Sequence, residues 1–74
     1  MNIYTAVFTN TNYPPLVFAA HSKSELTNKV RNHVGYLILK DQGLKTDLIA
    51  DADLYLLCDW IRRNFKCEYY VSVH

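Results

Sequence analysis

An apolar pattern at helical spacing near the end of the chain limits the folds open to this sequence. Its five members stand at positions i, i+3, i+4, i+7 and i+11: Leu54, Leu57, Cys58, Ile61 and Phe65. Residues with this spacing share one side of an α-helix. An apolar side of this kind has to pack against another element of the same domain. The pattern therefore predicts an amphipathic helix over residues 52–65.

A second helix is predicted to begin at Lys23. Ser22 and Glu25 have the spacing of a capping box, in which each side chain bonds the backbone N–H of the other residue. Four apolar residues then follow at helical spacing: Leu26, Val30, Val34 and Leu37. These signals predict a helix over residues 23–41.

The stretch after Gly35 allows two interpretations. Residues 36–40, "YLILK", are apolar on every side of a helical wheel. In the favoured interpretation the helix continues to Asp41 and Gly43 acts as its terminator, because glycine is common just after a helix. In the alternative the helix ends at Val34 and residues 36–40 form a short strand.

Three segments have the alternation and composition of β-strands. Residues 2–10 are rich in β-branched and aromatic side chains, and Tyr4, Ala6 and Phe8 share one face. Asn, Thr and two prolines then predict a turn, and residues 16–20 form the second strand of a hairpin. The final segment, residues 67–73, alternates well enough for a third strand.

The predicted element order is therefore strand, strand, helix, helix, strand. A chain of 74 residues is one domain with a small core. The economical arrangement is an α+β fold in which two helices cover one face of a three-stranded antiparallel sheet.

The cysteines and histidines do not have the spacing of a metal site. The candidate ligands are Cys58, Cys67, His21, His33 and His74. A structural zinc site needs paired ligands two to four residues apart, and the sequence has no such pairs. Cys58 lies in the apolar stripe and is expected to pack as a small hydrophobe. We expect both cysteines to be reduced and the protein to bind no metal or cofactor.

No catalytic motif stands out in the sequence, so we expect a protein that is not an enzyme. Two isolated glycines do not make a phosphate-binding loop. The carboxylates Asp47, Asp51, Asp53 and Asp59 cluster around the predicted start of the second helix. Such residues more often cap a helix than act as paired acids and bases, and Asp51 or Asp47 is the expected cap.

Charge and hydropathy exclude other classes. The net charge is +1, too small for a general nucleic-acid binder. No run reaches the ~18 apolar residues of a membrane span. The first ten residues lack the basic and apolar regions of a secretion signal. We expect a cytoplasmic protein that does not bind membranes.

A second stripe of the helix at 52–65 is the candidate partner-binding site. Leu56, Trp60 and Arg63 lie about 120° or more from the apolar stripe. Trp and Arg dominate the energetics of many interfaces. In the alternative interpretation the first helix packs across this stripe and buries it. Asp59 and Arg63 also have the spacing of an i, i+4 ion pair.

The leading functional hypothesis is a non-enzymatic protein-binding module. Its charged contacts would be Lys29, Arg31, Arg62 and Lys66. The alternative is a small nucleic-acid-binding module that contacts phosphates through four cations near the first helix: Lys23, Lys29, Arg31 and Lys40. Salt separates the two hypotheses, since phosphate contacts weaken steeply with ionic strength.

The element order and size resemble those of small phage-encoded proteins. The resemblance covers a hairpin, a helix entry of the type "AHSKSEL" at residues 20–26, and a final strand. Proteins of that kind block host enzymes or antiviral defences, including CRISPR effectors. The resemblance implies that this chain acts in a host cytoplasm by binding a host protein.

Overall fold

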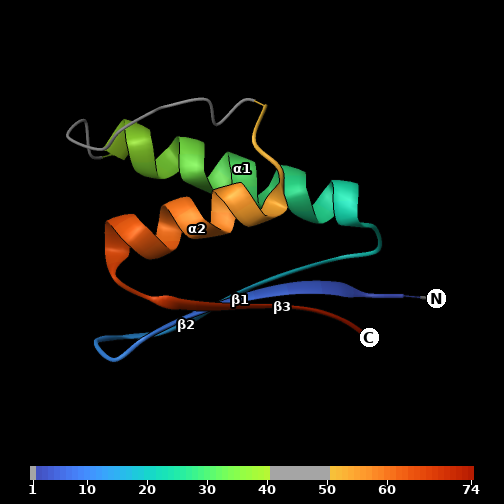
Figure 1. The fold of residues 1–74 in the computed structure, drawn as a ribbon, viewed down its shortest axis with the longest axis horizontal. Coiled ribbons are helices and arrows are strands. Elements are labelled where there is room, and N and C mark those ends of the chain that lie inside the picture. Colours follow the sequence, from blue (N-terminus) through green and yellow to red (C-terminus); the bar gives the residue numbers. More distant parts are fainter. Residues whose placement is uncertain (1, 41–50) are drawn as a thin grey trace.

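The structure is a computed structural model that describes residues 2–40 and 51–74. Within these residues the chain forms strands and helices in the expected order, and Figure 1 shows their arrangement. The elements are β1 (Tyr4–Asn10), β2 (Tyr13–Ala20), α1 (Lys23–Lys40), α2 (Leu54–Phe65) and β3 (Glu68–Val73). The prediction of an α+β fold of order β-β-α-α-β is confirmed.

The three strands form one antiparallel sheet in the order β2-β1-β3. Ala6 pairs with Phe18 on one side and with Val71 on the other, so β1 is the central strand. β2 begins at Tyr13, earlier than the expected residue 16. The additional residues include Pro14 and Pro15, which lie where the register between β1 and β2 shifts. An edge strand tolerates proline at such an irregularity.

Helix α1 runs without interruption from Lys23 to Lys40. The backbone N–H of Glu25 donates to Ser22 Oγ at 3.1 Å, which is one half of the expected capping box. Gly35 does not break the helix, and the alternative of a strand over residues 36–40 is wrong. The expected terminator, Gly43, lies outside the described residues.

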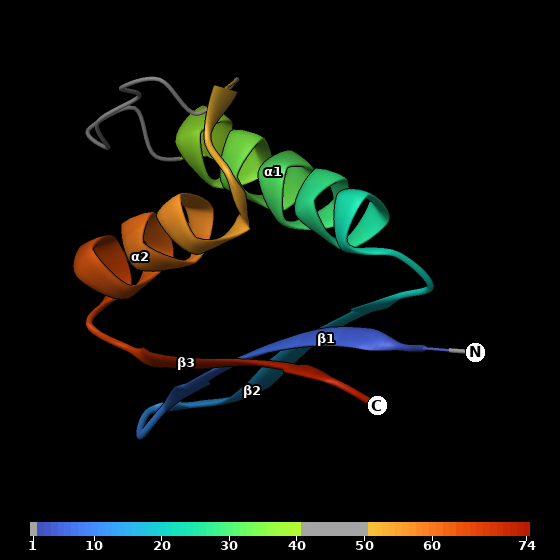
Figure 2. The same cartoon turned by 45° about the vertical axis from the view of Figure 1, so that its right-hand side comes forward.

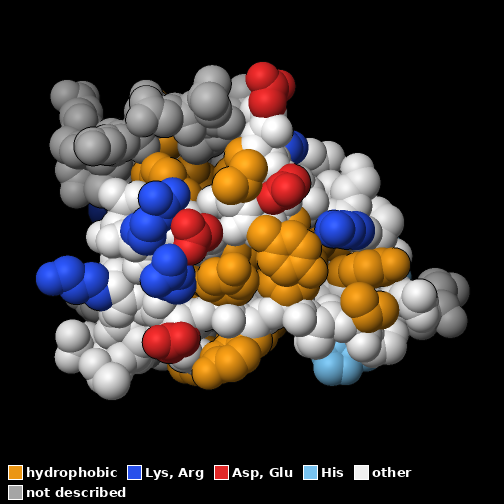
Figure 3. All heavy atoms as spheres, viewed as in Figure 1, with side chains coloured by type: hydrophobic (Ala, Val, Ile, Leu, Met, Phe, Trp, Pro, Cys, Tyr) orange, Lys and Arg blue, Asp and Glu red, His pale blue; other side chains and the backbone are white. Residues whose placement is uncertain are grey.

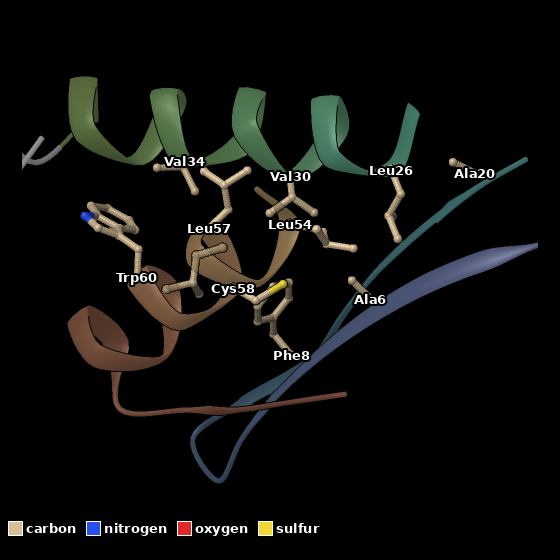
Figure 4. Close-up of a cluster of buried hydrophobic side chains, with 11 residues drawn as sticks. Ala6, Phe8, Ala20, Leu26, Val30, Val34, Leu54, Leu57, Cys58 and Trp60 are labelled. Atoms are coloured by element: carbon tan, nitrogen blue, oxygen red, sulfur yellow. The ribbon is translucent and has the colours of Figure 1, made fainter. Parts of the chain in front are cut away.

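Both helices lie on the same face of the sheet (Figure 2). Buried side chains from the helices and the sheet form the core between these layers. The sheet contributes small and aromatic residues, and each helix contributes its predicted apolar stripe. Figure 4 draws this cluster: Ala6, Phe8, Ala20, Leu26, Val30, Val34, Leu54, Leu57, Cys58, Trp60 and Ile61. Phe65, expected in the core, is 39% exposed at its margin because it is the last residue of α2.

The opposite face of the sheet carries side chains that no described helix covers. Val7 pairs with Val17 on β2 and with Tyr70 on β3, so these three side chains form a row across the strands. Val17 and Tyr70 are exposed. Near this row, Thr5 Oγ1 lies 2.8 Å from Ser72 Oγ.

Candidate functional site

Helix α2 is held at both ends by local hydrogen bonds. Asp53 Oδ1 accepts from the backbone N–H of Leu56 at 2.8 Å and is the N-cap. The expectation that Asp51 or Asp47 caps this helix is corrected for Asp51, and Asp47 lies outside the described residues. At the other end Lys66 adopts a left-handed conformation with φ 51° and ψ 51°. This residue stops the helix and turns the chain into β3.

The inner side of α2 is the one that the apolar stripe predicted. Leu54, Leu57, Cys58 and Ile61 are all buried. Trp60 is buried as well, with only 7% of its surface exposed. Of the two interpretations of this stripe, exposure is wrong for Trp60, and the alternative in which α1 covers it is confirmed for Trp60. Figure 4 shows the reason, since the indole of Trp60 points into the space beneath α1, close to Val34.

The other two members of the expected stripe are exposed. Leu56 is 58% exposed, and the side chain of Arg63 is 64% exposed. Tyr55, next to Leu56, is 50% exposed and carries the ammonium group of Lys23 5.3 Å from the centre of its ring. Apolar and basic side chains thus meet on the outer side of α2 (Figure 3). We call Tyr55, Leu56, Asp59, Arg62 and Arg63 the outer face of α2.

Asp59 organises the two arginines of this face. Arg62 Nε donates to Asp59 Oδ1 at 2.9 Å, and Arg63 Nε lies 3.1 Å from Asp59 Oδ2, as the i, i+4 spacing predicted. The hydrogen bond from Arg62 and the charges of both arginines hold the pKa of Asp59 below its ordinary value. One carboxylate therefore fixes two guanidinium groups, and the cluster keeps a net positive charge.

The expected charged contacts on α1 have structural partners instead. Lys29 Nζ donates to the carbonyl of Ala19 at 2.7 Å and joins α1 to β2. Arg31 Nη2 donates to the carbonyl of Ala52 at 2.8 Å and joins α1 to the segment before α2. Of the expected contacts, the structure brings Leu56, Arg62 and Arg63 together. It places Lys66 just beyond them and leaves Lys29 and Arg31 on the other helix.

Sequence reasoning missed Tyr55. Its signal was present, because Tyr55, Asp59 and Arg62 are spaced i, i+4 and i+7 and so form a stripe of their own. The helical wheel instead grouped the neighbouring Leu56 with Trp60 and Arg63. The structure shows that the outer face is centred on the Tyr55 stripe rather than on the Trp60 stripe.

A small apolar cavity of about 180 Å³ opens near the hairpin end of the core. None of the described residues that line it is Asp, Glu, Lys or Arg, and its walls are Phe8, Thr9, Asn10, Pro14, Leu16, His33, Leu37, Ile61, Phe65 and Cys67. The ring of His33 lies 5.3 Å from that of Phe18, and burial lowers the pKa of His33. The described lining of the cavity is therefore apolar and uncharged at physiological pH.

The described residues contain one exposed cluster of hydroxyl and imidazole groups. His74 Nε2 lies 3.1 Å from Ser72 Oγ and 3.4 Å from Thr5 Oγ1. In hydrolytic triads a further group orients the histidine, and no described carboxylate bonds His74. The described residues also contain no group of three or more His, Cys, Asp or Glu that could hold a metal ion.

Comparison with protein-family models, with curated proteins and with solved structures found no match to this chain. A search of the described helices for a segment of the length and hydropathy needed to cross a bilayer found none.

Proposed function

We propose that the chain is a non-enzymatic protein-binding module and that the outer face of α2 is its contact surface. One observation carries this proposal: two large apolar side chains, Tyr55 and Leu56, are at least half exposed beside an ordered pair of arginines. A rigid helix presents all of these groups. Little side-chain ordering then opposes binding, which favours affinity.

The residue types on the outer face of α2 indicate what kind of surface its partner presents. Tyr and Arg are enriched in the buried centres of protein interfaces. Tyr55 and Leu56 lie near the N-terminal end of α2. Arg63, near its C-terminal end, and Lys66, just after the helix, add positive charge there. The matching surface is an apolar patch bordered by carboxylates, because opposite charges speed association and exclude wrong partners.

The resemblance to small phage-encoded inhibitors extends this proposal. On that basis the partner is a host enzyme or a defence complex in the host cytoplasm, and the chain acts by occupying a surface rather than by a reaction. The small size of the chain suits this role, since a compact module can cover one site on a larger protein.

The nucleic-acid alternative has weaker support. Lys29 and Arg31 each donate to a backbone carbonyl, and Lys23 lies over the ring of Tyr55. These cations are directed at the protein itself, which reduces what they offer to phosphates. Binding that depends on nucleic acid would also weaken steeply as the salt concentration rises.

The test compares variants of the outer face with a matched control. Leu56→Ala and Arg63→Ala remove exposed groups, so both variants should melt like the parent chain. Leu39→Ala on α1 is the control, since Leu39 is 82% exposed and lies on the other helix. A partner is first captured with the parent chain from host lysate, with and without nuclease treatment, and identified by mass spectrometry.

The dissociation constant of the purified partner is then measured for the parent chain and for each variant. We expect Leu56→Ala and Arg63→Ala to weaken binding by about tenfold or more, and Leu39→Ala to leave it unchanged. Equal affinities for all four chains would exclude the outer face of α2. Capture that disappears after nuclease treatment would support the nucleic-acid alternative.

A further inference from the structure

The two edges of the sheet differ in how well they are protected against pairing with a strand of another chain. Ile3 and His74 exchange both backbone hydrogen bonds, at 2.9 and 2.8 Å, so Ile3 faces β3. Hydrogen-bonding direction alternates along a strand. In β1 the residues that bond β2 are therefore Tyr4, Ala6 and Phe8, whose partners are Ala20, Phe18 and Leu16. The outward positions of β2 alternate with these partners: Ala19, Val17 and, beyond Leu16 at the register shift, Pro15.

The outer edge of β2 is obstructed at two of these three positions. Pro15 has no N–H to offer to another strand. The carbonyl of Ala19 already accepts a hydrogen bond from Lys29 Nζ. Proline and lysine are common means by which proteins block an exposed strand edge. This edge is therefore a poor site for pairing with another chain.

No described residue obstructs the outer edge of β3 in this way. The same alternation turns the N–H and C=O groups of Tyr69, Val71 and Val73 away from β1. β3 contains no proline and no lysine, and its register with β1 is regular from Glu68 to Val73. Figures 1 and 2 show both helices above the sheet rather than beside β3.

We propose that two copies of the chain pair through β3, in antiparallel orientation, and join their sheets into one continuous sheet. The twofold axis passes midway between Val71 and Val71 of the second copy, which face each other. In this register Tyr69 faces Val73 of the second copy. All three outward residues are then in hydrogen-bonded pairs, and no symmetric register centred elsewhere on β3 pairs all three of them.

The side chains favour the same register. Tyr69 opposite Val73 is an aromatic and β-branched pair, which stabilises antiparallel strands. Glu68, the single charged residue of β3, faces His74 of the second copy instead of a second Glu68. His74 directs Nε2 at Ser72 and Thr5, and its Nδ1 makes no hydrogen bond with the described residues. An acid thus meets an imidazole at each end of the interface.

This inference does not depend on the proposed partner of α2, and the solution mass tests it. A monomer has a mass of 8.6 kDa, and the pairing predicts a concentration-dependent rise toward twice that value in sedimentation equilibrium. A chain that keeps the monomer mass up to about 1 mM would overturn the proposal.

Two proline variants identify the edge. Val73→Pro removes an outward N–H of β3, and Val17→Pro removes an outward N–H of β2. Both valines are exposed, and neither N–H bonds β1, so the substitutions are matched. We expect Val73→Pro to weaken dimerisation by at least tenfold and Val17→Pro to leave it unchanged. Equal dimerisation of both variants would place the interface elsewhere and overturn the proposal.

A disulfide test covers the case in which a proline variant does not fold. In a Cys67→Ser background, Val71→Cys places two cysteines opposite each other across the axis, at a Cα separation of about 5.5 Å that suits a disulfide. Ser72→Cys is the control, because it faces Tyr70 of the second copy. Oxidation should cross-link the Val71→Cys chain and not the Ser72→Cys chain. Failure of the first cross-link, or equal yields of both, would contradict the register.

Discussion

At the scale of single residues, the thiol of Cys58 has the most strongly shifted titration among the described groups. Cys58 is fully buried, and burial, together with the nearby Cys67, raises its pKa to about 12. Burial also raises the pKa of Cys67. Both residues are unpaired cysteines in the structure and carry their protons at neutral pH. Cys58 therefore behaves as a small apolar side chain, as the helical stripe indicated.

The raised pKa of Cys58 predicts a loss of stability at alkaline pH. An unfolded cysteine ionises near pH ~8.5, whereas the folded Cys58 ionises near 12. Its contribution is fully present below the unfolded pKa and is lost as the pH rises through the folded pKa. Urea denaturation from pH 8 to 11 should show a steeper fall in the free energy of unfolding for the parent chain than for Cys58→Ala.

The comparison between the two chains isolates the thiol, because tyrosines and lysines titrate in both. At pH 7, Cys58→Ala should lower the free energy of unfolding by roughly 1–3 kcal/mol through loss of a buried group. Identical slopes against pH in the two chains would show that Cys58 is accessible to water.

At the scale of elements, the N-terminus of α2 depends on a cap that the sequence left ambiguous. Asp53 accepts the N–H of Leu56, whereas Asp51 is exposed and lies before the helix. Asp53→Ala should lower the free energy of unfolding by about 0.5–2 kcal/mol in urea denaturation. Asp51→Ala is the matched control and should stay within about 0.5 kcal/mol of the parent chain. A larger effect at Asp51 would contradict the observed cap.

At the scale of the whole molecule, Trp60 joins the two helices. It is buried beneath α1, and its ring centre lies 6.3 Å from that of Phe65. Trp60→Ala should lower the free energy of unfolding by roughly 3–5 kcal/mol, which is a large part of the stability of a chain of this size. Circular dichroism should show a much lower melting temperature. A Trp60→Ala chain that melts normally would mean that the indole is exposed.

The interfaces proposed for the molecule use different surfaces of the C-terminal half. The outer face of α2 presents side chains to a different protein, while the edge of β3 presents backbone groups to a second copy. Variants at Leu56 and at Val73 separate them, because each changes one surface and leaves the other in place. A dimer would carry two outer faces of α2, so it could bind a partner that has two sites.

Local patterns in the amino-acid sequence are enough to place the helices and strands and most of their buried sides. Alternation at 2–10 and the stripe from Leu26 to Val34 depend on neighbours along the chain, so they predicted β1 and α1 closely. The same periodicity found the inner side of α2, and the spacing of Asp59 and Arg63 found their ion pair. In the candidate site, Leu56 and Arg63 were predicted to be exposed and are exposed.

The burial of Trp60 and the order of the strands, in contrast, depend on how the layers pack against each other. A helical wheel gives the angle of Trp60 around α2 but not the position of α1, which covers a second side of α2 besides the side that faces the sheet. Strand order likewise depends on pairing between Tyr4 and Val73, which are far apart in the sequence. Contacts of this kind depend on how the layers pack, and local sequence patterns do not predict that packing.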